Sequence, residues 1–436
     1  FKQKTAYEIP KRDWSSDVCS SDLLGGGNCC TARGGRDLMT MKLDGLRVLD
    51  LSLFLPGPAL TQILADHGAD VIKVEPPGEG EPNRHIGLRE DDVSVFFRNT
   101  HRGKRSVCIN LKSPEGRAAL LKIAASVDVF VEAFRPGVVD RLGVGYRAIE
   151  AVNPRIVYCS ISAFGQYGPR RDLPAHDLAT EALGGIVSLN LGGDGEPTLP
   201  HVPVADLSAA LYAFGGVMMA LYRREHSGRG DYLDVSMHDT VLASTPNVTG
   251  EVFAAKRPPV VKEFRSLGGS AFYRIYATRD RKHVVLGAQE VKFVRNLLSE
   301  LGRLDLLPLC ERGPGLHQKP VIDFLQSTFL TRTRDEWVEW FHGKDIGFAP
   351  VNDLREAFDE PQASARDMRL LDERGREHVG TPLKFSAEPG APRLTLPRLG
   401  EHNRAVLTEV GFDAAAIDAL YACGALADEH TAKNTH

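Results

Sequence analysis

Short β-rich runs alternate with helical stretches along residues 46–165, and this alternation limits the possible folds more than any other feature of the chain. Strand-forming runs lie at LRVLDL (46–51), DVIKVE (70–75), SVCINLK (106–112), DVFVEAF (128–134) and RIVYCSISAFG (155–165). Strands that alternate with helices favour parallel pairing, with the helices packed on the faces of the sheet. The sequence therefore predicts an α/β fold with a parallel sheet that carries helices on both faces.

Two of the connecting helices have recognisable end signals. PALTQILADHGA (58–69) predicts a helix that ends near Gly68. The next helix is expected to start after Ser113, which suits an N-cap, with Pro114 in its first turn.

The composition of the chain changes around residues 245–280. Prolines, basic residues and SLGGSAFY interrupt the helical pattern, and YRIYATRDRKHVVLGA (273–288) is typical of a β-hairpin. We therefore expect a large domain that begins with residues 39–235, a linker and smaller domain over 236–325, a return to the large domain over 326–425, and a tail over 426–436.

Residues 1–38 differ in character from the rest of the chain. They lack the apolar core and small cleavage residues of a signal peptide. Back-translation of KQKTAYEI and RDWSSDVCSSDL gives the sequences of common short-read sequencing adapters. We therefore expect a non-native leader, with the natural chain starting at Met39 or Met41.

Composition bounds the classes of partner. The chain has 436 residues, 42% of them hydrophobic, which is enough for two domains. A net charge of -4 argues against nucleic acid as a partner, and no run approaches the roughly 20 apolar residues that span a membrane. The cysteines of the body are scattered without metal-ligand spacing, so we expect no metal site and a reduced, cytoplasmic setting.

Several polar residues have two interpretations each. Basic side chains in NTHRGKRSVCINLK and FRPGVVDRLG either form a solvated face or hold phosphates. Asp206 starts a long helix, either as an N-cap or as a carboxylate aimed into a cleft. The same ambiguity applies to His176 with Asp177, and to Glu290 at a strand-to-helix turn. The first turn, LSLFLPGPALTQ, lacks G-x-G-x-x-G, which argues against a nicotinamide dinucleotide.

Segments spread over about residues 41–421 resemble the family III CoA-transferases and the related 2-methylacyl-CoA racemases. The resemblance is carried by LDGLRVLDLSLFLPGPALTQILADHGADVIKVEPPGEG, NTHRGKRSVCINLKSPEGR, NPRIVYCSISAFGQYGP, SGRGDYLDVSMHD and RLGEHNRAVLTEVGF. It implies a Rossmann-like large domain with a parallel sheet built from both chain ends, a smaller domain, and an interlocked homodimer.

The resemblance also implies where coenzyme A binds. CoA would contact Lys112, Phe134 and Arg141, with Arg105 in the basic turn, and the CoA thioester would be a substrate, with no tightly bound cofactor. Pro76 stands where the family often has an arginine. Arg84 or Arg89 would then substitute at the adenosine end.

Two reactions are consistent with the resemblance. In the transferases, the residue at Asp206 attacks an acyl-CoA, forms an aspartyl-CoA thioester and passes CoA to a free carboxylic acid. The amides at the helix start and a water-poor cleft would stabilise the oxyanion. In the racemases, Asp206 and His176 would act as two bases on opposite sides of the α-carbon, with Glu290 supporting the histidine.

Sequence features favour each reaction in turn. His176 stands where many transferases have Tyr or Phe, which favours the racemase. ADLSAALYAFGG differs from the glycine-rich GDFGGG of racemases, which favours the transferase, and SLGGSAFY is similar to the lid segments of both. We expect an acyl-CoA:carboxylate CoA-transferase, with an acyl-CoA racemase as the alternative and a catalytically silent CoA-binding scaffold as the non-enzyme interpretation.

Overall fold

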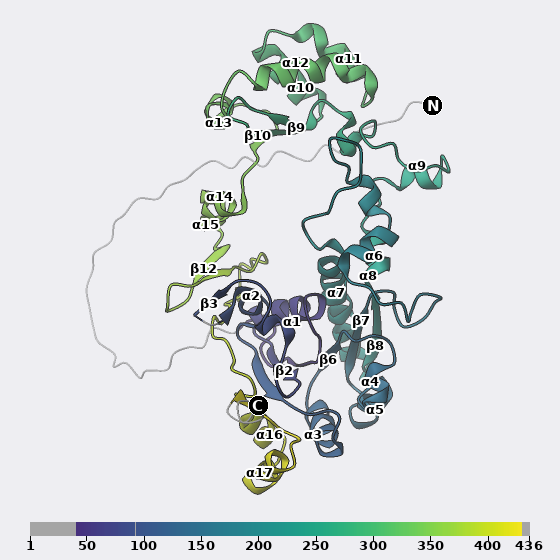
Figure 1. Ribbon diagram of the computed structural model, residues 1–436, viewed down its shortest axis with the longest axis vertical. Helices are drawn as coiled ribbons and strands as arrows, with labels where there is room; N and C mark the ends of the chain where they lie inside the picture. Colours follow the sequence, from purple (N-terminus) through teal and green to yellow (C-terminus); the bar gives the residue numbers. More distant parts are fainter. Residues whose placement is uncertain (1–40, 92, 430–436) are drawn as a thin grey trace, which may run out of the picture. The chain divides into compact units, whose positions relative to one another are not determined.

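A six-stranded parallel sheet organises the first half of the chain (Figure 1). The computed structural model describes residues 41–91 and 93–429, so the expected leader over 1–38 and most of the expected tail lie outside the described residues. The strand order is β5-β2-β1-β6-β7-β8, and every neighbouring pair is parallel. The strands are β1 (Arg47–Asp50), β2 (Asp70–Glu75), β5 (Arg105–Cys108), β6 (Val129–Glu132), β7 (Val157–Ser162) and β8 (Asp231–Ser236). The predicted parallel α/β sheet is confirmed.

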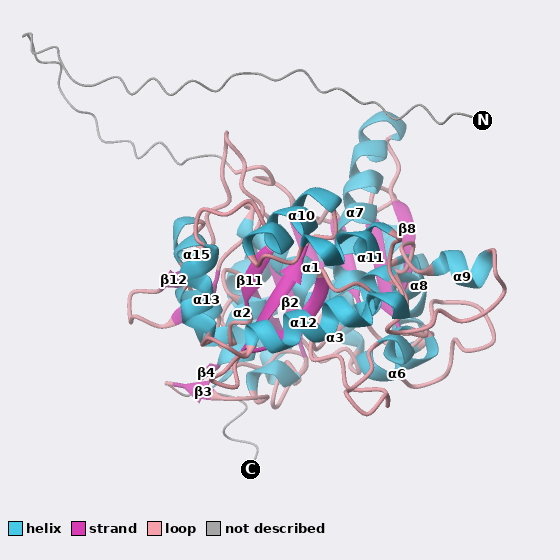
Figure 2. Cartoon of the chain, turned by 90° about the horizontal axis from the view of Figure 1, so that it is seen from above, coloured by secondary structure: helices cyan, strands magenta, loops and turns pink. Residues whose placement is uncertain are grey.

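Helices cover both faces of this sheet, and Figure 2 shows the strands between them. Successive residues of a strand point to opposite faces: Leu49 belongs to one hydrophobic core and Val48 to the other. The Leu49 core takes residues from α3 (Pro114–Ala124), α5 (Tyr146–Val152), α16 (Asn403–Glu409) and α17 (Ala414–Ala422). The Val48 core takes residues from α1 (Pro56–Asp66), α7 (Val204–Ser227) and α8 (Met237–Ala243). Both chain ends therefore build this domain, the C-terminal one through helices.

A third hydrophobic core follows the sheet domain. It contains the predicted hairpin, β9 (Tyr273–Ala277) and β10 (His283–Gly287), which pairs with β11 (Phe348–Pro350). The helices around it are α10 (Val291–Glu300), α11 (Leu307–Glu311), α12 (Lys319–Phe329) and α13 (Arg334–Phe341). Trp337 and Phe341 belong to this core and Phe348 packs against it, so it continues beyond the boundary expected at residue 325. An amphipathic helix has the same periodicity whichever core it covers, and the sequence pattern could not assign α12 and α13.

Shorter elements connect these parts. They are the helices α2 (Val95–His101), α4 (Val138–Arg141), α6 (Asp177–Leu183), α9 (Thr249–Phe253), α14 (Leu354–Asp359) and α15 (Pro361–Ala365), and the strands β3 (Arg89–Glu90), β4 (Val93–Ser94), β12 (Arg369–Leu371) and β13 (Glu377–Val379).

Of two N-caps considered from the sequence, the structure has Ser113 as an N-cap and Asp206 inside a helix. Ser113 caps α3 as predicted, because its hydroxyl accepts the Gly116 N–H at 2.9 Å. Asp206 is not an N-cap: it is the third residue of α7, whose N-cap is Pro203. Its carboxylate is therefore available for another purpose.

Helix α7 departs from the composition-based expectation about membranes. It is 24 residues long, and its most apolar 18-residue window has a mean hydropathy of 1.6, which is enough to cross a membrane by length and composition. The expectation that no such run exists was wrong on those two criteria. The helix packs against α1, α8 and β7.

Candidate active site

Two cavities adjoin one another at the carboxyl ends of the central strands, which is where ligands bind in open parallel α/β sheets. The first has a volume of about 410 Å³ and the second about 300 Å³. Leu53, just after β1, and Phe134, just after β6, line both cavities. A ligand long enough to pass Leu53 and Phe134 would occupy both.

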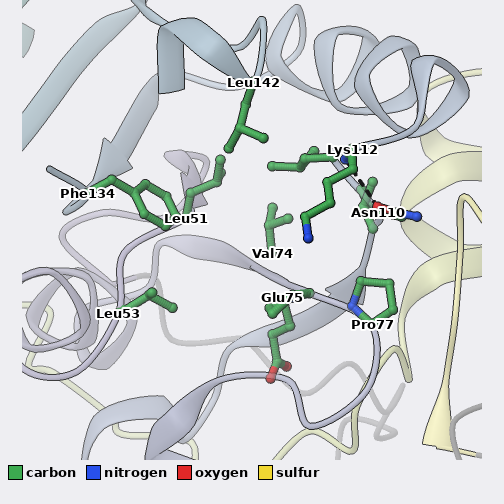
Figure 3. A pocket seen from close by; sticks show the side chains of 12 residues that line it. Leu51, Leu53, Val74, Glu75, Pro77, Asn110, Lys112, Phe134 and Leu142 are labelled. Carbon is green, nitrogen blue, oxygen red and sulfur yellow. Dashed lines mark hydrogen bonds between the residues drawn. The ribbon is translucent and has the colours of Figure 1, made fainter. Parts of the chain in front are cut away.

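The first cavity combines apolar walls with one cation. Leu51, Val74 and Leu142 are among its apolar lining residues. Figure 3 shows the Lys112 side chain extended toward the middle of the cavity, and Phe134 on the opposite wall. Among the described residues Lys112 makes no ion pair, so its charge is available to an anion.

Of the two other residues expected at the CoA site, Arg141 lies next to the first cavity and Arg105 lies away from it. Arg141 ends α4 directly before the lining residue Leu142, and it makes no ion pair within the described part of the chain. Arg105 is not brought to the site. It begins β5, at the amino-terminal end of the strand, whereas Lys112 follows the carboxyl end, and it pairs with Asp70 at 2.5 Å and Glu409 at 2.6 Å. Its position in the basic turn could not reveal this partnership, because Glu409 is far away in sequence.

The arginines considered for the adenosine end lie beside a third cavity of about 560 Å³. Arg84 is held by Glu75 through two hydrogen bonds of 2.7 Å, and its guanidinium stacks on Phe97. Arg89 also lines this cavity. Glu75 lines the first cavity, so the Arg84–Glu75 pair joins the walls of the two cavities.

The second cavity contains the reactive residues expected from the sequence. Asp206 and His176 both line it, with the guanidinium-bearing Arg135 and Arg171. Asp206 is partly buried, whereas His176, the N-cap residue of α6, is exposed. Glu290 is not with them: it is the exposed N-cap residue of α10 and lines neither cavity.

Two further carboxylates surround the first turn of α7. The Asp177 Oδ1 accepts the Asp206 N–H at 3.0 Å, and the Glu181 Oε1 accepts the Val204 N–H at 2.7 Å. Burial, together with the negative charges of Asp177 and Glu181, raises the pKa of Asp206 to about 7. The expectation that helix-start amides serve the oxyanion is therefore wrong for these two amides, since neighbouring carboxylates already occupy them.

A fourth carboxylate lies at the end of β6. Glu132 is buried and accepts the Phe134 N–H at 2.8 Å, so it fixes the residue shared by both cavities. Burial raises the pKa of Glu132 to about 7 despite hydrogen bonds from Ser160 and from the Phe134 amide.

A fully buried charged cluster supports the ends of β1 and β2. Asp50 lies 3.5 Å from the Lys73 ammonium and 3.3 Å from that of Lys104, and Lys73 lies 3.4 Å from Glu81. Although burial alone would raise it, the two lysines hold the pKa of Asp50 well below its usual range. Burial lowers the pKa of Lys104 to about 8, against the attraction of Asp50.

Some of these residues escaped the sequence analysis. Glu181 and Arg171 were not singled out, because one lies within a helix and the other in a loop with no recognisable motif. The buried cluster does leave a signal in the sequence, because Asp50 and Lys73 are charged residues inside the otherwise apolar runs LRVLDL and DVIKVE. Among the described residues, no group of three or more His, Cys, Asp or Glu side chains could hold a metal ion.

The fold and the paired cavities are those of an α/β enzyme. The model of CoA-transferase family III matches residues 43–403, so the chain belongs to the family III CoA-transferases, as the resemblance implied. A succinyl-CoA:glutarate CoA-transferase of Mus musculus is 31% identical to it, over 94% of this chain and 96% of that protein. An acetyl-CoA:oxalate CoA-transferase of Acetobacter aceti is 34% identical, over 80% and 92%. The crystal structure of a CAIB/BAIF family protein from Brucella suis superposes with a TM-score of 0.74 at 28% identity, over 85% of this chain and all of that one.

Proposed function

We propose that the protein transfers CoA from an acyl-CoA to a free carboxylic acid through a covalent intermediate on Asp206. The observation that carries the proposal is the position of Asp206 in a cavity that shares Leu53 and Phe134 with the cavity of Lys112. A CoA thioester bound with its phosphates toward Lys112 would place its acyl end toward Asp206.

The proposed transfer passes through covalent intermediates on the Asp206 carboxylate. An Asp206 carboxylate oxygen attacks the thioester carbon, and CoA leaves as a thiolate to give a mixed anhydride. The thiolate then attacks the Asp206 carbonyl carbon, which releases the donor acid and forms the aspartyl-CoA thioester. The acceptor carboxylate attacks the carbonyl carbon of this thioester, which expels the CoA thiolate and forms a second mixed anhydride. The thiolate then attacks the acceptor's acyl carbon, which forms the new acyl-CoA and releases the Asp206 carboxylate.

The arginines that line the second cavity indicate which class of acid would bind there. Arg135 makes no ion pair among the described residues, and Arg171 has only Asp172, 3.8 Å away. Guanidinium groups bind carboxylates through paired hydrogen bonds. We therefore propose a dicarboxylic acid as donor or acceptor, with one carboxylate at Asp206 and the other at these arginines. The relatives named for glutarate and oxalate support this class.

An acyl-CoA racemase is the second candidate, since His176 and Asp206 line the same cavity. The position of Glu290 outside that cavity gives this candidate less support, because the supporting group for the histidine is not beside it within one chain.

The proposed enzyme is a homodimer. Leu211, Met219 and Tyr222 lie along one face of α7 and are 61%, 69% and 72% exposed. A face of this kind on a long helix is typical of a subunit interface, and a second copy of the chain would cover it.

One experiment separates the two reactions. Wild-type protein is incubated in deuterated water with succinyl-CoA and glutarate, and in a separate reaction with a 2-methylacyl-CoA. Transfer of CoA to glutarate, without deuterium at the α-carbon of the 2-methylacyl-CoA, supports the transferase; deuterium incorporation without transfer contradicts it.

Two variants test the catalytic residue. Asp206→Ala is expected to lower kcat for transfer about 10³-fold or more, because no other carboxylate among the described residues lines this cavity. His176→Tyr is expected to retain transfer. Asp335→Asn, which removes a first-turn carboxylate of α13, is the matched control and should leave kcat unchanged. Full activity in Asp206→Ala would show that another residue carries the acyl group.

A further inference from the structure

Phe54, in the wall of the Asp206 cavity, has an unusual backbone conformation. Its φ is +62°, in the left-handed region that bulky side chains rarely adopt. Neither Leu53 nor Leu55, its neighbours in the chain, has a positive φ. Such conformations persist where surrounding structure enforces them, and they cluster at ligand sites.

Two buried side chains hold Phe54 in this conformation from both sides. The Phe54 N–H donates to the Glu81 Oε1 at 2.9 Å, and the Phe54 carbonyl accepts a hydrogen bond from the Asn83 amide. Glu81 and Asn83 are both fully buried. Glu81 is fixed in turn by Lys73, 3.4 Å away, so the charged cluster under β1 and β2 anchors Phe54.

The conformation decides where the phenyl ring lies. Its centroid is 5.8 Å from that of His176, with the rings at 87°, so the Phe54 ring meets the histidine edge-on. Phe54 is 40% exposed and lines only the second cavity, whereas Leu53 lines both. An aromatic ring in the wall of the cavity that Asp206 also lines offers a rigid surface to a group that approaches that carboxylate.

We propose that Phe54 determines specificity by limiting the bulk of the acyl group that reaches Asp206. The inference rests on the proposed function for its substrate class. The ring forms a wall that a linear chain can pass and a branched one cannot. The buried Glu81 and Asn83 keep this wall rigid, so that it does not yield to a larger acid.

The test uses two acyl-CoA thioesters that differ only in branching, glutaryl-CoA and 3,3-dimethylglutaryl-CoA. Their dissociation constants are measured by calorimetry, and transfer of CoA from succinyl-CoA to the two free acids is measured in parallel. Wild-type protein is expected to prefer the linear compound by about 10-fold or more in both measurements.

Phe54→Gly removes the ring and also relieves the backbone, since glycine adopts a positive φ freely. We expect it to fold with an unchanged or higher Tm and to reduce the preference about 10-fold, by improving binding of the branched compound. Phe54→Asn, which also tolerates this conformation, should do the same. Arg281→Gly is the matched control: Arg281 has the same φ of 62°, in the β9–β10 turn outside both cavities, and its loss should leave the preference unchanged.

An unchanged preference in folded Phe54→Gly or Phe54→Asn overturns the proposal. If wild-type protein transfers CoA to neither acid, the proposed function fails. The ratio of the two dissociation constants still decides the role of Phe54 in that case.

Discussion

The surroundings of Asp206 disfavour the ionised form of its carboxylate. Burial raises its pKa to about 7, with further contributions from Asp177 and Glu181. A carboxylate of higher pKa is a stronger nucleophile once ionised, but a smaller fraction is ionised at neutral pH. The neighbouring carboxylates therefore lower the ionised fraction of Asp206 at neutral pH and raise the nucleophilicity of its ionised form.

This arrangement predicts the pH dependence of activity. Since the ionised form of Asp206 attacks, kcat/KM should fall as the pH drops below about 7. Asp177→Asn keeps the acceptor for the Asp206 N–H but removes one negative charge, which stabilises the Asp206 carboxylate. We expect the acid limb to move down by about one pH unit.

The measurement is a kcat/KM profile from pH 5 to 9 with Asp335→Asn as the control. Glu132 also has a pKa of about 7 and positions Phe134. An acid limb that does not move in Asp177→Asn would contradict the assignment to Asp206 and point to Glu132.

At the scale of elements, the ends of β1 and β2 combine apolar packing with buried charge. Val48 and Leu49 face the two cores, whereas Asp50 joins Lys73 and Lys104 in a fully buried cluster. Such a cluster costs desolvation energy, so it adds less to stability than its short distances suggest. Its consequence is geometric, because it fixes the loop that carries Phe54.

Removing one member of the cluster should be costly. Asp50→Asn leaves two ammonium groups without their shared partner, and we expect the free energy of unfolding to fall by about 3 kcal/mol. Glu388→Gln breaks the exposed pair with Lys42 and should cost about 1 kcal/mol or less. Urea denaturation compares the two variants. Equal effects would show that burial does not make the Asp50 cluster different from a surface pair.

At the scale of the whole molecule, residues 403–426 return to the sheet domain that residues 47–236 begin. Val406 and Ile417, near the C-terminal end, belong to the same core as Leu49, and Ile109 bridges to Leu426. The ion pairs of Arg105 with Asp70 and Glu409 tie α16 to the strands. Arg105 therefore helps to hold the C-terminal helix α16 against the sheet.

The proposed dimer predicts the effect of charge on α7. Wild-type protein should sediment as a dimer at micromolar concentration. Met219→Glu places a charge on the exposed apolar face and should shift the protein toward monomer, because burying an unpaired carboxylate is costly. Leu316→Glu, at an exposed leucine that begins a short 3-10 helix directly before α12, is the control. Wild-type protein that sediments only as a monomer would contradict the proposal.

The sequence alone determined the parallel α/β class, the strand runs, the Ser113 cap and the family. These follow from local periodicity and from motifs, in which neighbouring residues carry the information. Glu132 already lay within a predicted strand, but its link to Phe134 required the folded chain.

Only the tertiary structure decided which side chains surround Asp206, where Arg105 goes and why Phe54 takes a left-handed conformation. Each depends on a partner that the fold brings from elsewhere in the chain: Asp177 to Asp206, Glu409 to Arg105 and Glu81 to Phe54. Such contacts leave no periodic trace in the sequence, because the path of the chain brings their members together.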